Sequence, residues 1–187
     1  MTRRSWMVLS AAAAAALSTA LALPALPAGA ATATANISAG SLAFVTTPPN
    51  VTFNDTLNGA NQTATATQAL DVSDGTGSGA GWNITATSTT FTTGSVTLST
   101  TATTVQSAPT TACDASSTCT LATNSVSYPY TLPAGASAPT ATKVFNAAVN
   151  TGQGQQTATV TWSLAIPSST VAGTYTSTWT ISLVSGP

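Results

Sequence analysis

The stretch LDVSDGTGSGAGWNI, Leu70–Ile84, decides the fold that we expect for this chain. It begins with alternating apolar and polar residues, passes through a turn with four glycines, and resumes with a tryptophan that opens a second apolar run. Alternation is typical of a half-buried strand, and glycine permits positive φ. The stretch therefore predicts two strands joined by a glycine-rich turn, and we expect the turn backbone to pass close under Trp82.

The C-terminal segment YTSTWTISLVSGP, Tyr175–Pro187, is a second alternating run. Its larger side chains, Trp179, Ile181 and Leu183, fall on one face of a strand, because successive side chains point to opposite faces. Threonine and serine occupy the other face.

Both segments resemble the two signature regions of the WxL domain, a secreted β-domain that coats the cell wall of Gram-positive bacteria non-covalently. The first region runs roughly V-x-D-x-R-G-T-G-x-G-W-x-L in that family. The chain matches it at Val72, Asp74, Gly75, Thr76, Gly77, Gly79, Gly81 and Trp82, lacks the arginine, and has Ile84 in the leucine position. The second region runs roughly G-T-Y-T-A-T-L-T-W-T-L-x-x-x-P. The chain matches it at Gly173, Thr174, Tyr175, Thr176, Thr178, Thr180, Leu183 and Pro187.

The second W-x-L motif of the family falls on Ile181-Ser182-Leu183, and the tryptophan stands two residues earlier, at Trp179. A shift of two keeps the side chain on the same face of a strand. The resemblance implies that the W-x-L positions bind a ligand, with cell-wall glycan or peptidoglycan as that ligand and a membrane-anchored surface protein as a partner. The implied ligand-binding residues are Trp82, Ile84, Trp179, Ile181 and Leu183, and the motif loop is formed by Asp74, Gly75, Thr76, Gly77, Gly79 and Gly81.

The pattern of the rest of the chain also predicts strands and turns. The run Ala158–Ile166 alternates with Trp162 on its apolar face, which predicts a core position for Trp162 and a hairpin with the C-terminal run. Weaker runs occur at residues 37–45, 51–53, 63–72, 82–87, 95–99, 126–132 and 143–149. Pro129 marks its run as an edge strand, because proline cannot donate to a central ladder. Short strands without a helical period predict an all-β fold, a single antiparallel β-sandwich with Greek-key-like connections.

The first thirty residues have the pattern of an export signal. Arg3 and Arg4 precede an apolar run, and Ala28-Gly29-Ala30 is a small-x-small cleavage site. We therefore expect residues 1–30 to be a signal peptide and residues 31–187 to form one secreted domain at the cell surface. N-terminal sequencing of the exported protein tests this, and a retained Met1 would contradict it.

Charge excludes several classes of function. The expected mature chain carries one Lys and four Asp, so its net side-chain charge is 1 − 4 = −3, and it contains no Arg, Glu or His. Such a chain cannot neutralise a run of phosphates, so we expect no binding of nucleic acid or of anionic lipid surfaces. No long apolar segment follows the signal, so we also expect no membrane insertion of the mature chain.

The only two cysteines, Cys113 and Cys119, are separated by five intervening residues in a chain that we expect to be exported. An even count in an oxidising compartment predicts that they form a disulfide. A redox or metal site would need a Cys-x-x-Cys spacing or histidine partners.

Catalysis is not expected, because no set of nucleophile, base and orienting group can be assembled from four Asp, one Lys and three Tyr. Asp71 and Asp74 are close in sequence, which leaves two alternatives open: a carboxylate pair as in glycosidases, or part of a calcium loop. An Asp-Gly turn explains Asp74 more simply. We predict no catalytic residues, no metal site and no cofactor.

Two functions remain. The first is a secreted, non-enzymatic surface protein that associates non-covalently with the cell wall through a WxL-like domain, with Trp82 and Trp179 contributing more than Trp162. The alternative is a structural subunit of a surface filament or coat that assembles by strand pairing.

Overall fold

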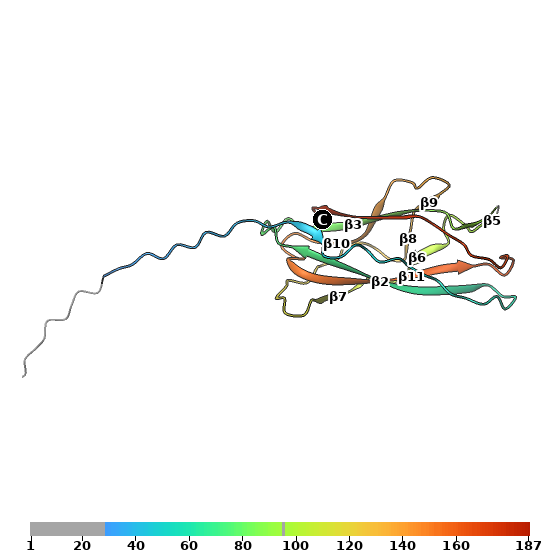
Figure 1. Ribbon diagram of the computed structural model, residues 1–187, viewed down its shortest axis with the longest axis horizontal. Helices are drawn as coiled ribbons and strands as arrows, with labels where there is room; N and C mark the ends of the chain where they lie inside the picture. The colour runs from blue at the N-terminus through green and yellow to red at the C-terminus, as the bar shows by residue number, and fades with distance from the viewer. Residues whose placement is uncertain (1–28, 95) are drawn as a thin grey trace, which may run out of the picture. The chain divides into compact units, whose positions relative to one another are not determined.

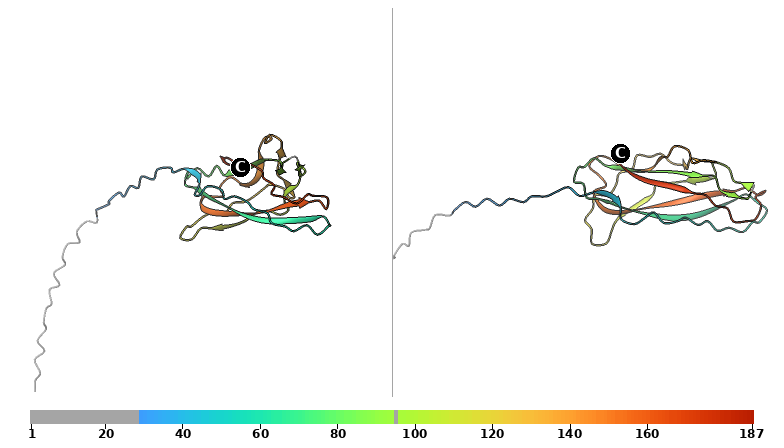
Figure 2. Two further views of the ribbon diagram at one scale, coloured as in Figure 1. Left: turned by 45° about the vertical axis from the view of Figure 1, so that its right-hand side comes forward. Right: turned by 45° about the horizontal axis from the view of Figure 1, so that its top comes forward.

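The computed structural model describes residues 29–94 and 96–187 (Figures 1 and 2). The predicted signal peptide, residues 1–30, lies outside this range except for its last two residues. The chain divides into two units, Met1–Asn36 and Ile37–Pro187. Within the first unit, residues 29–36 are exposed and form no strand, and the second unit contains the sheets. None of the described residues forms a helix able to cross a membrane.

The second unit is built from two packed β-sheets and a small hairpin (Figure 2). Its strands are β1 Leu42–Phe44, β2 Gln62–Asp74, β3 Trp82–Thr89, β4 Thr92–Thr93, β5 Val96–Thr97, β6 Thr103–Val105, β7 Thr110–Cys113, β8 Tyr130–Thr131, β9 Ala134–Gly135, β10 Thr142–Ala147, β11 Gly154–Ile166 and β12 Trp179–Ser185. The first sheet has the order β1-β2-β11-β6-β8, with β7 also paired to β11. The second has the order β10-β3-β12, with β9 parallel to β3, and β4 pairs with β5.

Of the long strands, β2 and β11 lie in the first sheet and β3, β10 and β12 in the second, so β11 and β12 are neighbours in sequence but not in a sheet. β2 pairs with β11 along its whole length, from Gln62 opposite Ile166 to Asp74 opposite Gly154. The predicted hairpin of Ala158–Ile166 with the C-terminal run is therefore wrong, because β11 lies in the first sheet and β12 in the second. Both strands have one apolar face, and the segment between them lets the chain cross the sandwich so that these faces meet across the core instead of pairing side by side.

The core lies between the sheets and is formed by the inward residues of both. Its largest fully buried side chains are Trp82, Trp162, Phe145, Leu70, Ile84, Leu132, Gln156, Val72, Val105, Val144, Val160 and Asn146. The expected core position of Trp162 is confirmed, since none of its surface is exposed. Its indole N–H donates to the side-chain amide oxygen of Gln68 at 3.0 Å, which compensates the burial of that polar group.

The all-β sandwich predicted from the sequence is confirmed, and the strand bounds refine it. Of the run 37–45 only residues 42–44 form a strand, β1, and the run 51–53 forms no strand although Val51 and Phe53 pack against the core. The run 126–132 contributes only β8, which lies at the edge of its sheet, as Pro129 predicted.

Candidate functional site

The two signature segments, far apart in sequence, form neighbouring antiparallel strands. β3 and β12 pair with Ile84 opposite Leu183, and Trp179 lies opposite Ser88 near the other end of the pair. The side chains of Ile84, Trp179 and Leu183 all point toward the core. The sequence placed these residues on apolar faces correctly, but nothing in it showed that the two faces join into one surface.

Trp82 and Ile84 lie wholly inside this surface. Neither side chain has any exposed area. The Trp82 indole N–H donates to the Gly152 carbonyl oxygen at 2.9 Å, and its ring centre lies 5.8 Å from that of Phe145. A ligand would have to open the core to touch either residue, so the structure gives them a packing role.

Trp179, Ile181 and Leu183 are half-buried on the same face. Trp179 meets Trp162 edge-on with ring centres 4.8 Å apart, a geometry that stabilises aromatic pairs by about 0.5–1.5 kcal/mol. Phe53 and Phe91 flank the same ring at 6.4 and 6.3 Å. Part of each of the three side chains faces solvent, and their contact with a ligand stays a prediction.

The motif loop has a conformational role that its glycines make possible. Gly77, Gly79 and Gly81 have φ of 65°, 64° and 73°, as the glycine pattern predicted. Asp74 begins the loop, because its Oδ1 accepts hydrogen bonds from the Thr76 backbone N–H at 3.0 Å and from the Thr76 hydroxyl at 2.7 Å.

The prediction that this loop passes close under Trp82 is wrong. The backbone beneath the indole belongs to Gly152, where an added Cβ would lie 2.6 Å from the Trp82 ring nitrogen. Gly152 follows β10 in the chain, so a segment 70 residues away supplies the contact that the local sequence suggested.

Asp71 and Asp74 do not form a carboxylate pair. Asp74 is on the inward side of β2 and buried, whereas Asp71 is three residues earlier and points to the opposite face. The two carboxylates therefore do not converge on one side of the strand, as either a glycosidase pair or a shared calcium site would require.

The neighbour of Asp71 is Asp114, which follows β7. Thr157 lies between them on β11: it is opposite Asp71 in the ladder, and its hydroxyl donates to Asp114 at 2.9 Å. Burial raises the pKa of Asp71, and a hydrogen bond to the Asp114 carboxyl and the negative charge of that group raise it further. Because the folded pKa exceeds the unfolded one, this group favours folding at acidic pH, and its contribution is lost as pH rises through the folded pKa.

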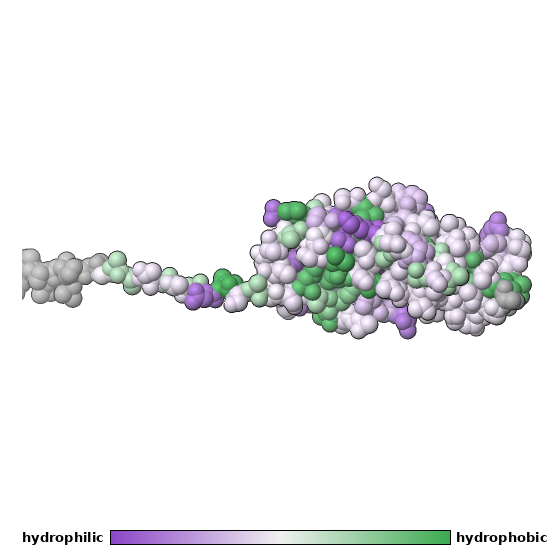
Figure 3. Space-filling view, turned by 90° about the horizontal axis from the view of Figure 1, so that it is seen from above, coloured by the Kyte–Doolittle hydropathy of each residue, from purple (hydrophilic) through white to green (hydrophobic). Residues whose placement is uncertain are grey.

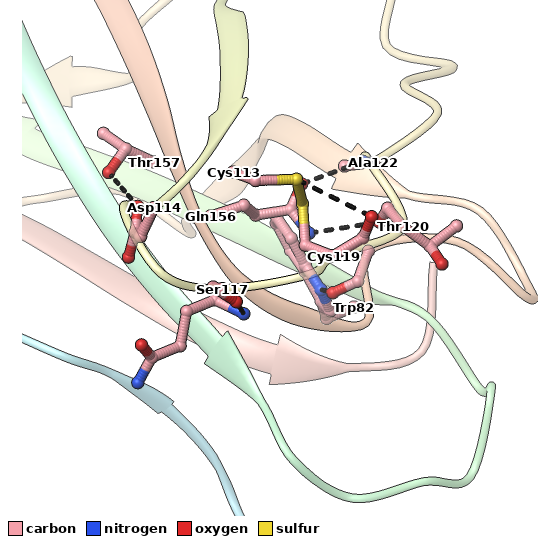
Figure 4. Close-up of a disulfide and its surroundings, with 11 residues drawn as sticks. Trp82, Cys113, Asp114, Ser117, Cys119, Thr120, Ala122, Gln156 and Thr157 are labelled. Atoms are coloured by element: carbon pink, nitrogen blue, oxygen red, sulfur yellow. Dashed lines mark hydrogen bonds between the residues drawn. A yellow bond between two sulfur atoms is a disulfide. The ribbon is translucent and has the colours of Figure 1, made fainter.

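The predicted disulfide between Cys113 and Cys119 is confirmed (Figure 4). The fully buried Gln156 side chain lies beneath it and holds the irregular segment that follows Cys119. The Gln156 side-chain oxygen accepts from the Ala122 N–H at 2.8 Å, and its amide donates to the Thr120 carbonyl at 3.3 Å. The cross-link and Gln156 thus fix the same irregular segment.

Replacing both cysteines by serine is expected to lower the free energy of unfolding by about 2–3 kcal/mol and to leave the domain folded, because a short loop is closed and Gln156 still holds the segment. Chemical denaturation of the double variant measures the loss. Thiol labelling of the native protein without reductant should give no signal, and a labelled thiol would contradict the assignment.

Two grooves that the sequence did not reveal lie along the open side of the sandwich, where residues 46–57 pass the core. The first, of about 850 Å³, is lined by residues 51–57, Phe91, Leu98, Leu164, Ile166 and residues 170–175. The second, of about 730 Å³, is lined by residues 47–52, Gln68, Phe91 and residues 175–181. They share Val51, Thr52, Phe91 and Tyr175. No local pattern marks them, because each combines segments from distant parts of the chain.

The first groove joins apolar and polar groups in one hollow. Phe53, Phe91 and Tyr175 supply aromatic rings, and Asn54 and Asp55 supply polar side chains beside several threonines. The chain as a whole is weakly charged, with 4% charged residues, and the face drawn in Figure 3 is mostly of intermediate hydropathy. Ligand sites commonly have this apolar lining with a few polar groups.

Comparison with protein-family models, with curated proteins and with solved structures found no match to the chain.

Proposed function

We propose that the chain is a secreted, non-enzymatic surface protein that associates non-covalently with the cell wall, with glycan or peptidoglycan as its ligand. A membrane-anchored surface protein is the partner that the WxL resemblance suggests. The observation that carries the proposal is the first groove, whose aromatic rings and polar groups lie together at one end of the sandwich.

The chemistry of the groove suits a sugar chain. Apolar C–H faces of sugar rings pack on aromatic side chains, and sugar hydroxyls find hydrogen-bonding partners in Asn54, Asp55 and the threonines. Tyr175 lines this groove and also belongs to the second signature segment. One residue of the WxL resemblance is therefore part of the proposed binding site. Its hydroxyl donates to the Val171 carbonyl oxygen at 2.9 Å, which holds the rim loop in place.

Electrostatic attraction contributes little to this association. The expected mature chain has a single cationic side chain, Lys143, and its ammonium donates to the Pro187 carbonyl oxygen at 2.6 Å. Wall polymers that carry phosphate would find no basic patch to bind. Apolar and hydrogen-bonding contacts therefore supply the binding energy, and in such contacts a few central side chains dominate.

Val171→Asp tests the groove. Val171 is 58% exposed on its rim, so the substitution leaves the core intact and places a carboxylate where a ligand would exclude water. We expect co-sedimentation with purified Gram-positive cell walls to weaken on the order of tenfold or more, which corresponds to about 1.4 kcal/mol. Val149→Asp is the matched control, since Val149 is 57% exposed and lies outside both grooves.

Equal sedimentation of the wild type and Val171→Asp would remove the groove from the proposal. A wild-type protein that stays in the supernatant would contradict wall binding itself.

One observation favours the second function, a filament or coat subunit that assembles by strand pairing. β12 is at the edge of its sheet, with β3 on one side and the second groove on the other. An uncovered strand edge is a template for pairing with another chain.

A further inference from the structure

The outer edge of the C-terminal segment has free backbone groups over nine residues, from Tyr175 to Leu183. Thr176 exchanges backbone hydrogen bonds with Thr92, and the Thr178 carbonyl accepts from the Thr89 N–H, so the even-numbered residues face β3 and β4. Backbone groups alternate in an antiparallel ladder, which directs those of the odd-numbered residues outward. Within the described residues, no hydrogen bond joins the backbone of Tyr175, Ser177, Trp179, Ile181 or Leu183 to a neighbour on that side.

The other edge of the same sheet is covered. Asn124 accepts from the Asn146 N–H at 3.1 Å, and the Tyr128 hydroxyl donates to the Val144 carbonyl oxygen at 2.6 Å, so residues 124–130 protect β10. β12 has a groove at the corresponding place, with residues 47–52 as its far wall. The sandwich thus has room beside β12 for one more extended segment.

The chain contains a segment that fits this place. Residues 31–39, with the sequence ATATANISA, alternate strictly between apolar and polar side chains. We call this segment the N-terminal arm. Its alternation is that of a half-buried strand, yet every residue in it is exposed, Ile37 to 93%, and none belongs to a strand. The arm has a strand pattern without a strand partner.

We infer that the N-terminal arm of one copy adds as a strand to the free edge of β12 in a second copy, with its alanines and Ile37 facing the second groove. The nine residues of the arm match the nine-residue edge from Tyr175 to Leu183. Alanine is small enough for a narrow space, and neither the arm nor the groove carries a charged side chain that would oppose burial. The inference rests on the second candidate function and is independent of wall binding.

A second copy is the occupant because every copy carries both halves of the contact. The arm has a strand pattern without a strand partner, and the β12 edge has free backbone groups. Head-to-tail addition of this kind joins different surfaces of the two copies, and it produces an open chain of subunits where the rotation between copies does not close into a ring.

A matched pair of substitutions tests the inference in the exported protein. Ile37→Lys puts a charge on the apolar face of the arm, and Ser38→Lys puts the same charge one residue later, on the face that stays in water. Sedimentation velocity should show concentration-dependent assemblies for the wild type and for Ser38→Lys, and monomers only for Ile37→Lys. Ile37 is outside the core, so both variants should unfold as the wild type does.

Equal assembly of the two variants would overturn the role of the arm while leaving self-assembly in place. A wild type that is monomeric at every concentration would overturn the filament function and the inference together.

A synthetic peptide of residues 31–39 identifies the edge. Added to the Ile37→Lys protein, whose β12 edge stays free, it should slow hydrogen exchange at the amides of Trp179, Ile181 and Leu183 at least tenfold. The edge of β2 offers a competing site, since it is unpaired beyond β1. Slowed exchange at Thr63, Thr65 and Thr67 instead would refute docking at β12, and so would no change at either edge.

Discussion

Replacing Trp82 with alanine is expected to lower the free energy of unfolding by about 3–5 kcal/mol, enough to unfold much of the protein at a typical domain stability. The indole is fully buried and packs against Phe145. Its removal leaves a cavity between the sheets and strips the buried Gly152 carbonyl oxygen of its donor. Urea denaturation followed by circular dichroism measures the loss.

Trp82→Phe separates the two contributions. It keeps most of the apolar volume but cannot donate to Gly152, so it should cost clearly less than the alanine variant. A stable, folded Trp82→Ala protein would contradict the core assignment and would restore Trp82 as a candidate ligand contact. Loss of wall binding in this variant carries no information about the ligand unless the protein is first shown to be folded.

The burial of Trp82 explains why the first signature segment has a tryptophan at this position. The ring fills the space where β3 leaves the motif loop, and the chain segment after β10 accepts its hydrogen bond. The residues named from the family resemblance therefore divide into two groups. Trp82 and Ile84 hold the sheets together, whereas Trp179 lines the second groove and is in reach of a ligand or of another chain.

The sequence predicted the faces of the strands well and their partners poorly. Alternation is a local property, so Trp162, Trp179 and Ile181 could be placed on inward faces before the structure was known. Pairing depends on which segments the chain brings together. β11 pairs with β2, where Trp162 lies opposite Ala66, ninety-six residues earlier, and it does not pair with the C-terminal run that follows it. The short separation in sequence favoured a hairpin of β11 with β12. The structure instead buries the apolar faces of both strands against each other across the core.

The candidate site was harder to predict for the same reason. Tyr175 and Phe91 line both grooves, but they approach each other only because β12 follows β3 in the sheet and the β4–β5 hairpin extends from it. The edge of β12 is free because, within the described residues, no other strand pairs with it on that side. No sequence pattern predicts that a strand will lack such a neighbour. The N-terminal arm is the exception, since its strict alternation is visible in the sequence and gains meaning once its exposure is known.

Gly81→Ala is expected to destabilise the domain by about 2–5 kcal/mol, although it adds a single methyl group. Gly81 has a φ of 73°, and a Cβ there would lie 2.4 Å from the Ala147 carbonyl oxygen and 2.9 Å from that of Ala148. Both obstacles are backbone atoms that cannot turn aside as a flexible side chain would. Moving the loop would strain the hydrogen bond from the Gly186 N–H to the Gly81 carbonyl oxygen.

Gly77→Ala is the matched control within the same loop. Gly77 has a similar φ of 65°, but nothing lies within 4 Å of its would-be Cβ, so only the backbone conformation is penalised, by about 1–2 kcal/mol. The difference between the two variants in urea denaturation isolates the close approach of the loop to the segment after β10. If both glycines tolerate alanine equally, the loop is not packed as described, and the glycine pattern of the first signature segment needs an explanation other than this contact. If Gly81→Ala alone is unstable, that glycine is required for packing whether or not the domain binds a wall polymer.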